Sequence, residues 1–299
     1  MSVAIFCTAS HWNTEAILLA AKRVAMKYDL KDIPVVVANT FNYPYMPQAT
    51  RFTYAGEPRS GFLAHMGNLR ALAEGKYAPY NDINVLPHLD HADPVRDRWA
   101  LTAGVPFFSS VMFDCQAYPH EDNIAQTKEY VKAYGDQVLV EGIIGTLNVE
   151  GKATAQLTGD YCERAREYVL ATGVDFFVAD LGTEQQASSV GGARYDRDRA
   201  RALTEALNKK MLVLHGTSCL TNDQVAGLAG DGIVRVNMWT RIAREAGQYA
   251  AQKLMERMDD VRAGAFDATE ANMYIRDNVE KAADIMCEMM ELFGYANWH

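Results

Sequence analysis

The stretch VLPHLDH at residues 85–91 joins a short apolar run to the polar side chains His88, Asp90 and His91. Residues 85–89 are too few and too apolar for a surface helix, so they predict a buried strand that ends just before Asp90. Seven other short apolar runs share this form, and they are residues 3–6, 35–38, 107–112, 138–142, 176–179, 211–214 and 233–236. The sequence therefore predicts eight strands.

Longer amphipathic stretches separate these runs, with helical candidates at residues 121–134, 161–171, 241–258 and 269–292. Alternating strands and helices are typical of parallel βα units, which form either a closed barrel or an open doubly wound sheet. The open sheet is less favoured, because no G-x-G-x-x-G motif follows a strand. We therefore predict an α/β fold, a (β/α)8 TIM barrel in a single domain over residues 1–299, with an extra C-terminal helix.

The composition describes an ordinary globular protein, with 49% hydrophobic and 22% charged residues among 299. A net charge of −9 opposes nucleic-acid binding, because a phosphate backbone attracts a basic face. Five cysteines without a C-x-x-C pair suggest a reducing compartment. The N-terminus has neither a basic start nor an apolar run long enough for a secretory signal or a membrane span. We expect a cytoplasmic protein that binds neither membrane nor nucleic acid.

Two stretches, residues 39–59 and 148–159, are too long for simple loops of a barrel. Loops of that length usually cover the functional site, and we expect both to do so. They contain Arg51, Arg59 and Lys152, which could meet an anionic group of a ligand. Exposed basic residues are more often simply solvated, so no specific role is assigned to them.

A barrel carries its functional side chains at the carboxyl ends of its strands. Polar residues are found at six of these ends, and they are Asp90 with His91, Asp114, Glu141, Asp180, His215 and Asn237. A single histidine beside an apolar strand is more often a hydrogen-bonded structural residue. Two histidines at strand ends with carboxylates nearby favour a functional site, and we predict that His91 and His215 share one.

His91 and His215, joined by an oxygen donor, suit a borderline metal such as zinc with one position left open for a substrate. Such an ion acts as a Lewis acid, because it polarises a carbonyl and stabilises the enediolate formed when the neighbouring carbon loses a proton. The turn from His215 through Gly216 and Thr217 to Ser218 offers backbone N–H groups and two hydroxyls to an anion such as phosphate. Similar turns also occur as ordinary loops.

Four segments together resemble the class II fructose-bisphosphate and tagatose-bisphosphate aldolases. They are VLPHLDH at 85–91, SSVMFD at 109–114 followed by EDN at 121–123, VLHGTS at 213–218, and VNMWT at 236–240. Each segment alone is a modest match, whereas their order and spacing are specific and span most of the chain. The resemblance implies a metal-dependent aldolase.

The resemblance also implies roles for individual residues. Asp90 corresponds to the general acid/base, and His91 and His215 correspond to ligands of a divalent metal, zinc in the first place. Asp114 corresponds to a carboxylate near the metal. The remaining matches are substrate-binding positions: Gly216, Ser218 and Thr240 at the donor phosphate, and Asn237 near the donor's reactive carbon. For Asp114 and Asn237, capping of a strand end is the simpler alternative.

The chain departs from the family pattern at the third metal ligand, where Gln185 replaces a histidine. A neutral amide is a poorer zinc ligand than imidazole. Three arrangements remain open: Gln185 binds weakly, Glu184 supplies a carboxylate, or another histidine such as His11 takes the position. The Gly and Lys that follow this histidine in the family, where they help to bind phosphate, are missing from QASS at 186–189.

Two further departures bear on the substrate. Only Glu141 remains of the family's E-x-E, and Trp239 stands where the family has a small or acidic residue. An indole there narrows a pocket, stacks on a substrate or fills a gap. These departures indicate a substrate different from that of the typical family member, with less phosphate or none.

The leading hypothesis is a lyase that reversibly cleaves a ketose or ketose phosphate into a dihydroxyacetone-type ketone and an aldehyde. A metal-dependent sugar isomerase or epimerase, and a non-catalytic barrel subunit that supports a partner aldolase, are the alternatives. We expect a homodimer or homotetramer. The C-terminal methionines Met286, Met289 and Met290, with Leu292, either form a subunit contact or belong to the core of one chain.

Overall fold

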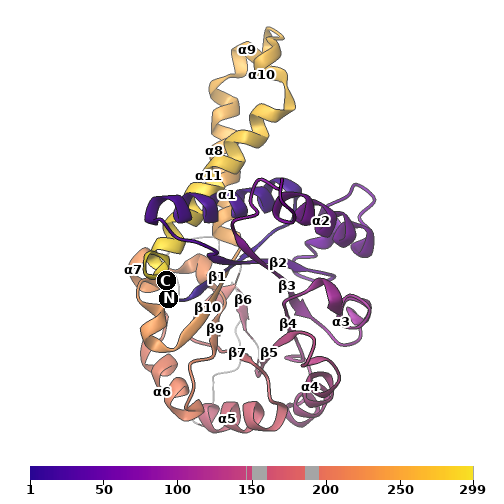
Figure 1. Cartoon of the computed structure of the whole chain (residues 1–299), viewed down its shortest axis with the longest axis vertical. Coiled ribbons are helices and arrows are strands. Elements are labelled where there is room, and N and C mark those ends of the chain that lie inside the picture. Colours follow the sequence, from indigo (N-terminus) through magenta and orange to yellow (C-terminus); the bar gives the residue numbers. More distant parts are fainter. Residues whose placement is uncertain (146, 150–159, 186–194, 299) are drawn as a thin grey trace.

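The computed structural model describes residues 1–145, 147–149, 160–185 and 195–298. Eight parallel strands form a closed barrel in the order β1-β10-β9-β7-β5-β4-β3-β2 (Figure 1). The strands are β1 (Val3–Cys7), β2 (Pro34–Thr40), β3 (Asn84–Ala92), β4 (Ser110–Phe113), β5 (Leu139–Ile143), β7 (Phe176–Val178), β9 (Leu212–Leu214) and β10 (Ile233–Met238). The predicted TIM barrel is confirmed, because each strand overlaps one of the eight predicted runs.

Helices surround the barrel and connect its strands (Figure 1). The longer ones are α1 (His11–Tyr28), α2 (Pro58–Ala73), α4 (His120–Tyr134), α5 (Tyr161–Thr172), α6 (Arg197–Leu207), α8 (Thr240–Glu256) and α11 (Ala271–Leu292). Short helices include α3 (Arg98–Leu101), α7 (Asn222–Val225), α9 (Met258–Arg262) and α10 (Phe266–Thr269). Helices α4, α5, α8 and α11 match the four predicted helices within about two residues.

Three strand predictions need correction. The third strand continues to Ala92, beyond its predicted end at residue 89. The fourth strand begins at Ser110 and not at residue 107, because Val105–Phe107 form a 3-10 turn that Pro106 favours through its fixed φ. The short strands β6 (Asn148–Val149) and β8 (Glu184–Gln185) pair with each other outside the barrel and were not predicted. Two-residue strands carry too little periodicity to be recognised in a sequence.

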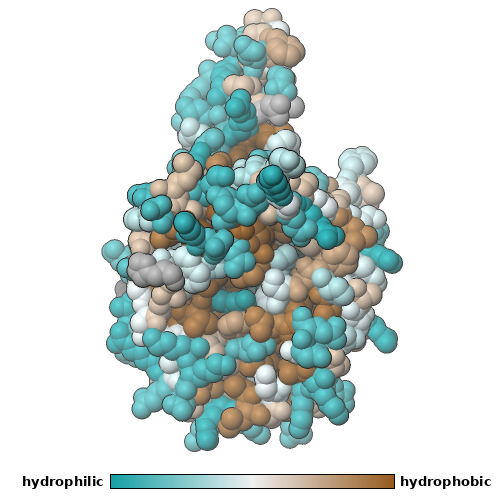
Figure 2. Space-filling model, viewed as in Figure 1, coloured by the Kyte–Doolittle hydropathy of each residue, from teal (hydrophilic) through white to brown (hydrophobic). Residues whose placement is uncertain are grey.

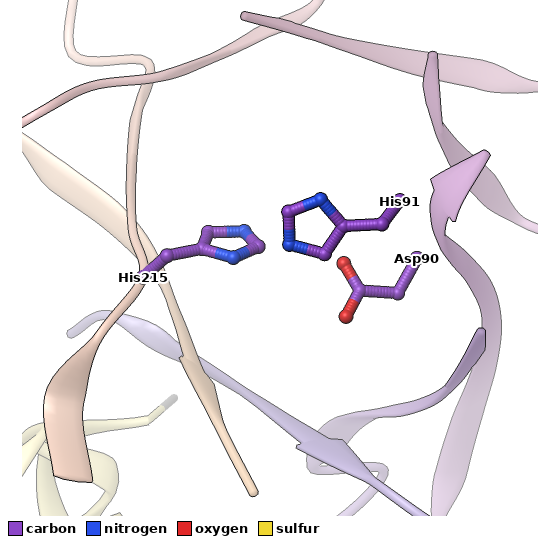
Figure 3. A group of neighbouring side chains, drawn as sticks. All are labelled: Asp90, His91 and His215. Carbon is purple, nitrogen blue, oxygen red and sulfur yellow. The ribbon is translucent and has the colours of Figure 1, made fainter. Parts of the chain in front are cut away.

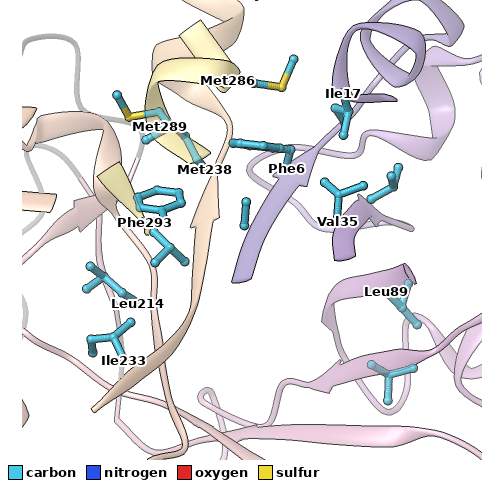
Figure 4. Packing of buried hydrophobic residues seen from close by; sticks show 14 of the residues in the cluster. Phe6, Ile17, Val35, Leu89, Leu214, Ile233, Met238, Met286, Met289 and Phe293 are labelled. Atoms are coloured by element: carbon cyan, nitrogen blue, oxygen red, sulfur yellow. The ribbon is translucent and has the colours of Figure 1, made fainter. Parts of the chain in front are cut away.

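The hydrophobic core has two parts. The larger part lies between the strands and the surrounding helices and includes Phe6, Leu89 and Phe293 (Figure 4). The smaller part fills the barrel interior, with Ile5 and Val213 among its members. On the face shown in Figure 2, hydrophobic residues gather toward the middle and hydrophilic residues predominate along the edge. Because the side chains of a strand point alternately into and out of the barrel, the strands contribute to both parts of the core.

The C-terminal part forms a helical hairpin. Helices α8 and α11 pack along each other and project from the barrel, with α9 and α10 at the far end (Figure 1). Met286, Met289 and Met290 are buried in the core of this chain, so the methionines serve intramolecular packing. Both termini lie together, where the Ser2 N–H donates to the Phe293 carbonyl at 2.9 Å. No helix within the described residues is both long and apolar enough to cross a membrane.

Candidate active site

Asp90, His91 and His215 converge at the carboxyl end of the barrel (Figure 3). Asp90 and His91 lie near the end of β3, just before its last residue Ala92, and His215 follows β9, which lies across the barrel from β3. One potential metal-binding atom from each side chain lies within 4.8 Å of the other two, and all three residues are buried. We call these three residues the upper cluster. The structure thus brings together the two histidines and the aspartate singled out in the sequence.

The backbone at His91 explains how two consecutive residues both face this cluster. Regular strand geometry would send neighbouring side chains to opposite faces. His91 has a φ of +48°, in the left-handed region, and the pairing of β3 with β4 shifts register between Leu89 and Ala92. A non-glycine residue in such a conformation costs about 1–3 kcal/mol, and this strain is common at functional sites. The strand end therefore turns His91 toward Asp90.

The imidazole of His91 is held from several sides. Its Nδ1 lies 2.7 Å from Oδ2 of Asp114, and the ring of Tyr43 stacks on it at 4.4 Å between centroids. Burial opposes protonation of His91, but the charges of Asp90 and Asp114 outweigh this and raise its pKa. Because Asp114 accepts the Nδ1 proton, Nε2 is the atom that His91 presents to the cluster.

His215 is presented by a tightly packed turn. Gly216 has a φ of +69°, and a Cβ there would lie 2.9 Å from both the carbonyl carbon of Glu184 and Oγ1 of Thr183, so only glycine fits. Thr183 donates its hydroxyl proton to the His215 carbonyl at 2.6 Å. Burial lowers the pKa of His215 to about 4. The ring is therefore neutral at pH 7 and keeps a lone pair for a metal.

The position next to His91 is taken by Gln185. Its amide nitrogen lies 3.1 Å from Nε2 of His91, and its side chain lines the cavity above the cluster. Glu184, its neighbour on β8, is not among the lining residues. His11 packs edge-on against Phe52 at 5.3 Å between ring centroids. Residues 186–189 lie outside the described part of the chain. Of the three candidates for the third ligand, only Gln185 reaches the cluster.

The upper cluster fits a divalent metal. Nε2 of His215 and Oδ1 of Asp90 are buried and have no hydrogen-bond partner among the described residues. Buried polar atoms without partners are costly: a bound cation would satisfy Nε2 of His215, and its charge would stabilise the nearby carboxylate of Asp90. Two imidazoles, which bind a metal in their neutral form, together with a carboxylate or amide oxygen form a donor set that suits zinc and related ions. The hydrogen bond from His91 to Asp114 is the outer contact that orients a metal-binding histidine.

The cavity above the cluster contains most of the predicted substrate-binding residues. Gly216, Ser218, Asn237 and Thr240 line it, whereas Asp114 lies behind His91. Other lining residues were not singled out as site residues in the sequence, and they are Cys7, Thr40, Tyr43, Met46 and Gln48. Cys7 ends β1, so the strand-end rule would have found it. Tyr43, Met46 and Gln48 belong to the long stretch at 39–59, which was expected to cover the site.

Asp90 lies at the floor of this cavity beside a thiol. Sγ of Cys7 is 3.6 Å from Oδ2 of Asp90 and 3.2 Å from Oδ1 of Asn237. Burial and the charge of Asp90 raise the pKa of Cys7, so the thiol stays protonated and can donate weakly. Burial opposes ionisation of Asp90, but the imidazoles of His91 and His215 hold its pKa below the usual value. Asp90 is thus a carboxylate ready to accept a proton.

Helix α8 begins at the edge of the cavity. Trp239 precedes its first residue, Thr240, and supplies no capping oxygen. The first-turn N–H groups therefore lack a side-chain cap at the end of a helix whose dipole favours negative charge. Trp239 lines the cavity beside Thr240, as its departure from the family pattern suggested. This edge can accept an oxygen-rich or anionic group next to an aromatic wall.

A second group of polar side chains lies deeper in the barrel, and we call it the lower cluster. It consists of His88, Ser110, Glu141 and Arg235, all buried. Arg235 donates to Oε1 of Glu141 at 2.6 Å and to Ser110 at 3.0 Å. Nδ1 of His88 lies 2.8 Å from the Ser110 hydroxyl. His88 and Glu141 each use one side-chain atom in these contacts, their other atoms, Nε2 and Oε2, lie 3.7 Å apart without a hydrogen bond, and neither residue lines the cavity.

Comparison with known proteins agrees with this geometry. The family model of class-II fructose-bisphosphate aldolase matches residues 1–298. A fructose-bisphosphate aldolase of Giardia intestinalis is 33% identical over 52% of this chain and 49% of that protein, so the match spans about half of that relative. One of Streptococcus pneumoniae is 28% identical over 68% of this chain and 71% of that protein. A 6-phospho-5-dehydro-2-deoxy-D-gluconate aldolase of Shouchella clausii is 34% identical over 53% of each chain.

Solved structures share the fold. The fructose-bisphosphate aldolase of Campylobacter jejuni superposes with a TM-score of 0.73 at 15% identity, covering 98% of this chain and 90% of that one. The YdjI aldolase of Escherichia coli K12 gives a TM-score of 0.66 at 17% identity, covering 99% and 92%. At such identities the likeness concerns the barrel alone. Because the family model extends over almost every residue, the chain belongs to the class-II fructose-bisphosphate aldolase family.

Proposed function

We propose that the protein is a metal-dependent aldolase that reversibly cleaves a ketose or ketose phosphate into a dihydroxyacetone-type ketone and an aldehyde. Proteins of this family are lyases. The observation that carries the proposal is the upper cluster, in which two histidines and an aspartate meet at the floor of a cavity with unpartnered atoms. Other buried atoms without partners, such as those of His88 and Glu141, belong to residues that line no cavity, so the position of the upper cluster at a cavity is what favours a ligand.

His91 and His215 would hold the metal, which we propose to be zinc, as is typical of this divalent-metal-dependent family. Gln185 is the preferred third ligand, since rotation of its amide would offer the carbonyl oxygen in place of the nitrogen. Glu184 is the weaker candidate, because it would have to turn toward the cavity. When bound, the ion supplies Lewis-acid stabilisation of negative charge that develops on the ketone oxygen. Asp114 keeps His91 oriented for this task.

Asp90 moves the proton in the proposed reaction. As a carboxylate it accepts the proton of the hydroxyl that becomes the aldehyde, and it returns a proton in the synthetic direction. Its place at the cavity, where it is ionised, supports this role. The thiol of Cys7 contacts this carboxylate and the amide oxygen of Asn237, and all three residues line the cavity. We propose that Asn237 also contacts the ketone half of the substrate.

The ketone half would occupy the edge formed by Gly216, Ser218 and Thr240. The uncapped start of α8 and the hydroxyls of Ser218 and Thr240 support binding of a phosphate or of sugar hydroxyls there. Trp239 reduces the room beside this edge and supports a substrate different from that of the typical family member. The substrate class is therefore a sugar or sugar phosphate.

We further propose that the chain acts as one domain, residues 1–299, in a homodimer or homotetramer. The α8–α11 hairpin projects from the barrel and exposes Met255 and Phe266, which supports a role in subunit contact. The five cysteines are free, which supports a reducing, cytoplasmic location.

The test combines metal analysis with product analysis. Purified protein is assayed for metal by elemental analysis and for retro-aldol cleavage of ketose phosphates, before and after chelation. We expect about one divalent ion per chain and activity that chelation removes. Asp90→Asn should retain the ion and lose at least about a hundredfold in kcat, the usual share of general acid/base catalysis.

Other outcomes would assign the alternatives. Isomerised or epimerised products without cleavage would identify a sugar isomerase or epimerase. A metal-free, inactive protein after reconstitution would overturn the proposal in favour of a subunit that supports a partner aldolase.

A further inference from the structure

The β2–α2 segment, residues 41–57, brings an aromatic ring into direct contact with a proposed metal ligand. The phenol ring of Tyr43 lies parallel to the imidazole of His91, with 4.4 Å between centroids and 11° between planes. Both residues are buried, and Tyr43 also lines the cavity. Its ring covers one face of His91, while Asp114 holds the edge that carries Nδ1.

The segment that carries Tyr43 is fixed at its base by hydrogen bonds. The backbone N–H of Thr40 donates to Oε1 of Gln48 at 3.0 Å, and the N–H of Gln48 donates to Oγ1 of Thr40 at 2.9 Å. The Thr40 hydroxyl in turn donates to the carbonyl of Met46. These bonds close the loop from the last residue of β2 to Gln48. Tyr45 packs edge-on against Tyr43 at 5.3 Å.

His91 needs such support. The left-handed backbone of His91 is strained, so contacts with neighbouring residues must hold its imidazole ring in this orientation. The hydrogen bond to Asp114 fixes one atom of the ring but still permits it to swing about that bond. A parallel ring on one face removes this freedom, and it also excludes water from that face.

We propose that Tyr43 is a positioning residue for His91, so that metal binding in the upper cluster and closure of the β2–α2 segment stabilise each other. The inference rests on the proposed metal site. A metal bound to Nε2 fixes the imidazole in the orientation on which Tyr43 packs. If closing the segment raises the affinity for the metal by some factor, binding of the metal raises the equilibrium constant for closure by the same factor.

The test measures Zn²⁺ affinity by competition with a coloured chelator. Tyr43→Leu removes the ring and should weaken Zn²⁺ binding about 10–100-fold, the usual effect of losing an outer contact of a metal ligand. Tyr43→Phe retains the ring and should bind within about twofold of wild type, which would assign the effect to the ring and not to the hydroxyl; circular dichroism of both variants checks that they fold. Tyr54→Leu alters a fully exposed tyrosine of the same segment and should leave the affinity unchanged.

Hydrogen exchange gives a second measurement. Zn²⁺ should slow amide exchange over residues 41–48 in wild type and in Tyr43→Phe, and much less in Tyr43→Leu. Equal Zn²⁺ affinity of Tyr43→Leu and wild type would overturn the inference and leave the proposed metal site intact. A wild-type protein that binds no Zn²⁺ would overturn both.

Discussion

The upper and lower clusters are built from the same kinds of side chain, yet they differ in what faces them. In the lower cluster, His88 and Glu141 meet Ser110 and Arg235, and Nε2 of His88 lies 3.7 Å from Oε2 of Glu141. In the upper cluster, Oδ1 of Asp90 and Nε2 of His215 have no hydrogen-bond partner within the described ranges. The lower cluster also has two atoms without a hydrogen-bond partner, Nε2 of His88 and Oε2 of Glu141, but these face each other inside the barrel, whereas the unpartnered atoms of the upper cluster belong to residues that line a cavity.

The comparison separates two histidines that stand three positions apart on β3. His88 points into the barrel with regular strand geometry and is neutral, because burial lowers its pKa. His91 is turned by its left-handed backbone toward the carboxyl end. Residue type therefore does not identify a site, since the partners that tertiary structure supplies determine whether a histidine supports the fold or a ligand.

The largest expected effect comes from breaking the lower cluster. Arg235→Met leaves the carboxylate of Glu141 buried without its cation, and we expect the free energy of unfolding to fall by about 3–5 kcal/mol. The double variant Glu141→Gln with Arg235→Met should recover most of this loss, because no unpaired charge remains. Urea unfolding of the three proteins measures both values. A single-variant loss below about 1 kcal/mol would mean that the Arg235–Glu141 ion pair contributes no more to stability than a surface pair.

The two histidines of β3 give the direct contrast. His91→Ala removes a proposed ligand and should weaken Zn²⁺ binding more than about a hundredfold, beyond the 10–100-fold typical of outer contacts. His88→Ala should lower stability and change Zn²⁺ affinity by less than about tenfold, since His88 is not on the cavity wall. Chelator competition on both folded variants distinguishes them. Equal losses of affinity would mean that the clusters act as one unit.

His65 offers a third kind of histidine, which has neither a partner nor a cavity. Both ring nitrogens are buried without hydrogen bonds among the described residues, and Phe52 stacks on the ring at 4.4 Å. Burial, with a smaller contribution from His11, lowers the pKa of His65 to about 3. As the pH falls below 6.5, the ordinary pKa of histidine, His65 becomes protonated in the unfolded chain but stays neutral in the native protein. Stability is therefore lost on acidification.

The expected size follows from linkage. Between pH 8 and pH 5 the native protein should lose about 2 kcal/mol through His65, at 1.36 kcal/mol for each pH unit below 6.5. His65→Leu should lose less stability than wild type over the same range, by about this amount. Urea unfolding at both pH values provides the comparison. Parallel pH dependences for the two proteins would show that His65 is hydrated or hydrogen-bonded in solution.

The smallest expected effect concerns the open side of the upper cluster. Gln185→His replaces an amide beside Nε2 of His91 with an imidazole, which is the better zinc ligand, and should raise Zn²⁺ affinity at least about tenfold. Glu184→His, one residue away on β8 and off the cavity wall, should produce no gain. If only Glu184→His raised the Zn²⁺ affinity, residue 184 and not residue 185 would supply the third ligand.

The sequence by itself predicted the barrel and the polar side chains that meet at its carboxyl end. Eight apolar runs separated by amphipathic stretches can bury their side chains only in a closed or doubly covered parallel sheet, and the strand-end polar residues then share one rim. Asp90, His91 and His215 follow from this rule together with the family resemblance. Periodicity is a local property, so local sequence is sufficient to reveal it.

Only the tertiary structure determined which polar residues contact one another. It paired Glu141 with Arg235, placed Asp114 behind His91, and brought Tyr43 from a long connecting segment onto the same ring. It also chose Gln185 over His11 beside the cluster. These contacts join residues far apart in the chain, and their partners depend on barrel closure and on one left-handed backbone angle at His91. No local pattern specifies such geometry, because each contact is set by strands that meet only after folding.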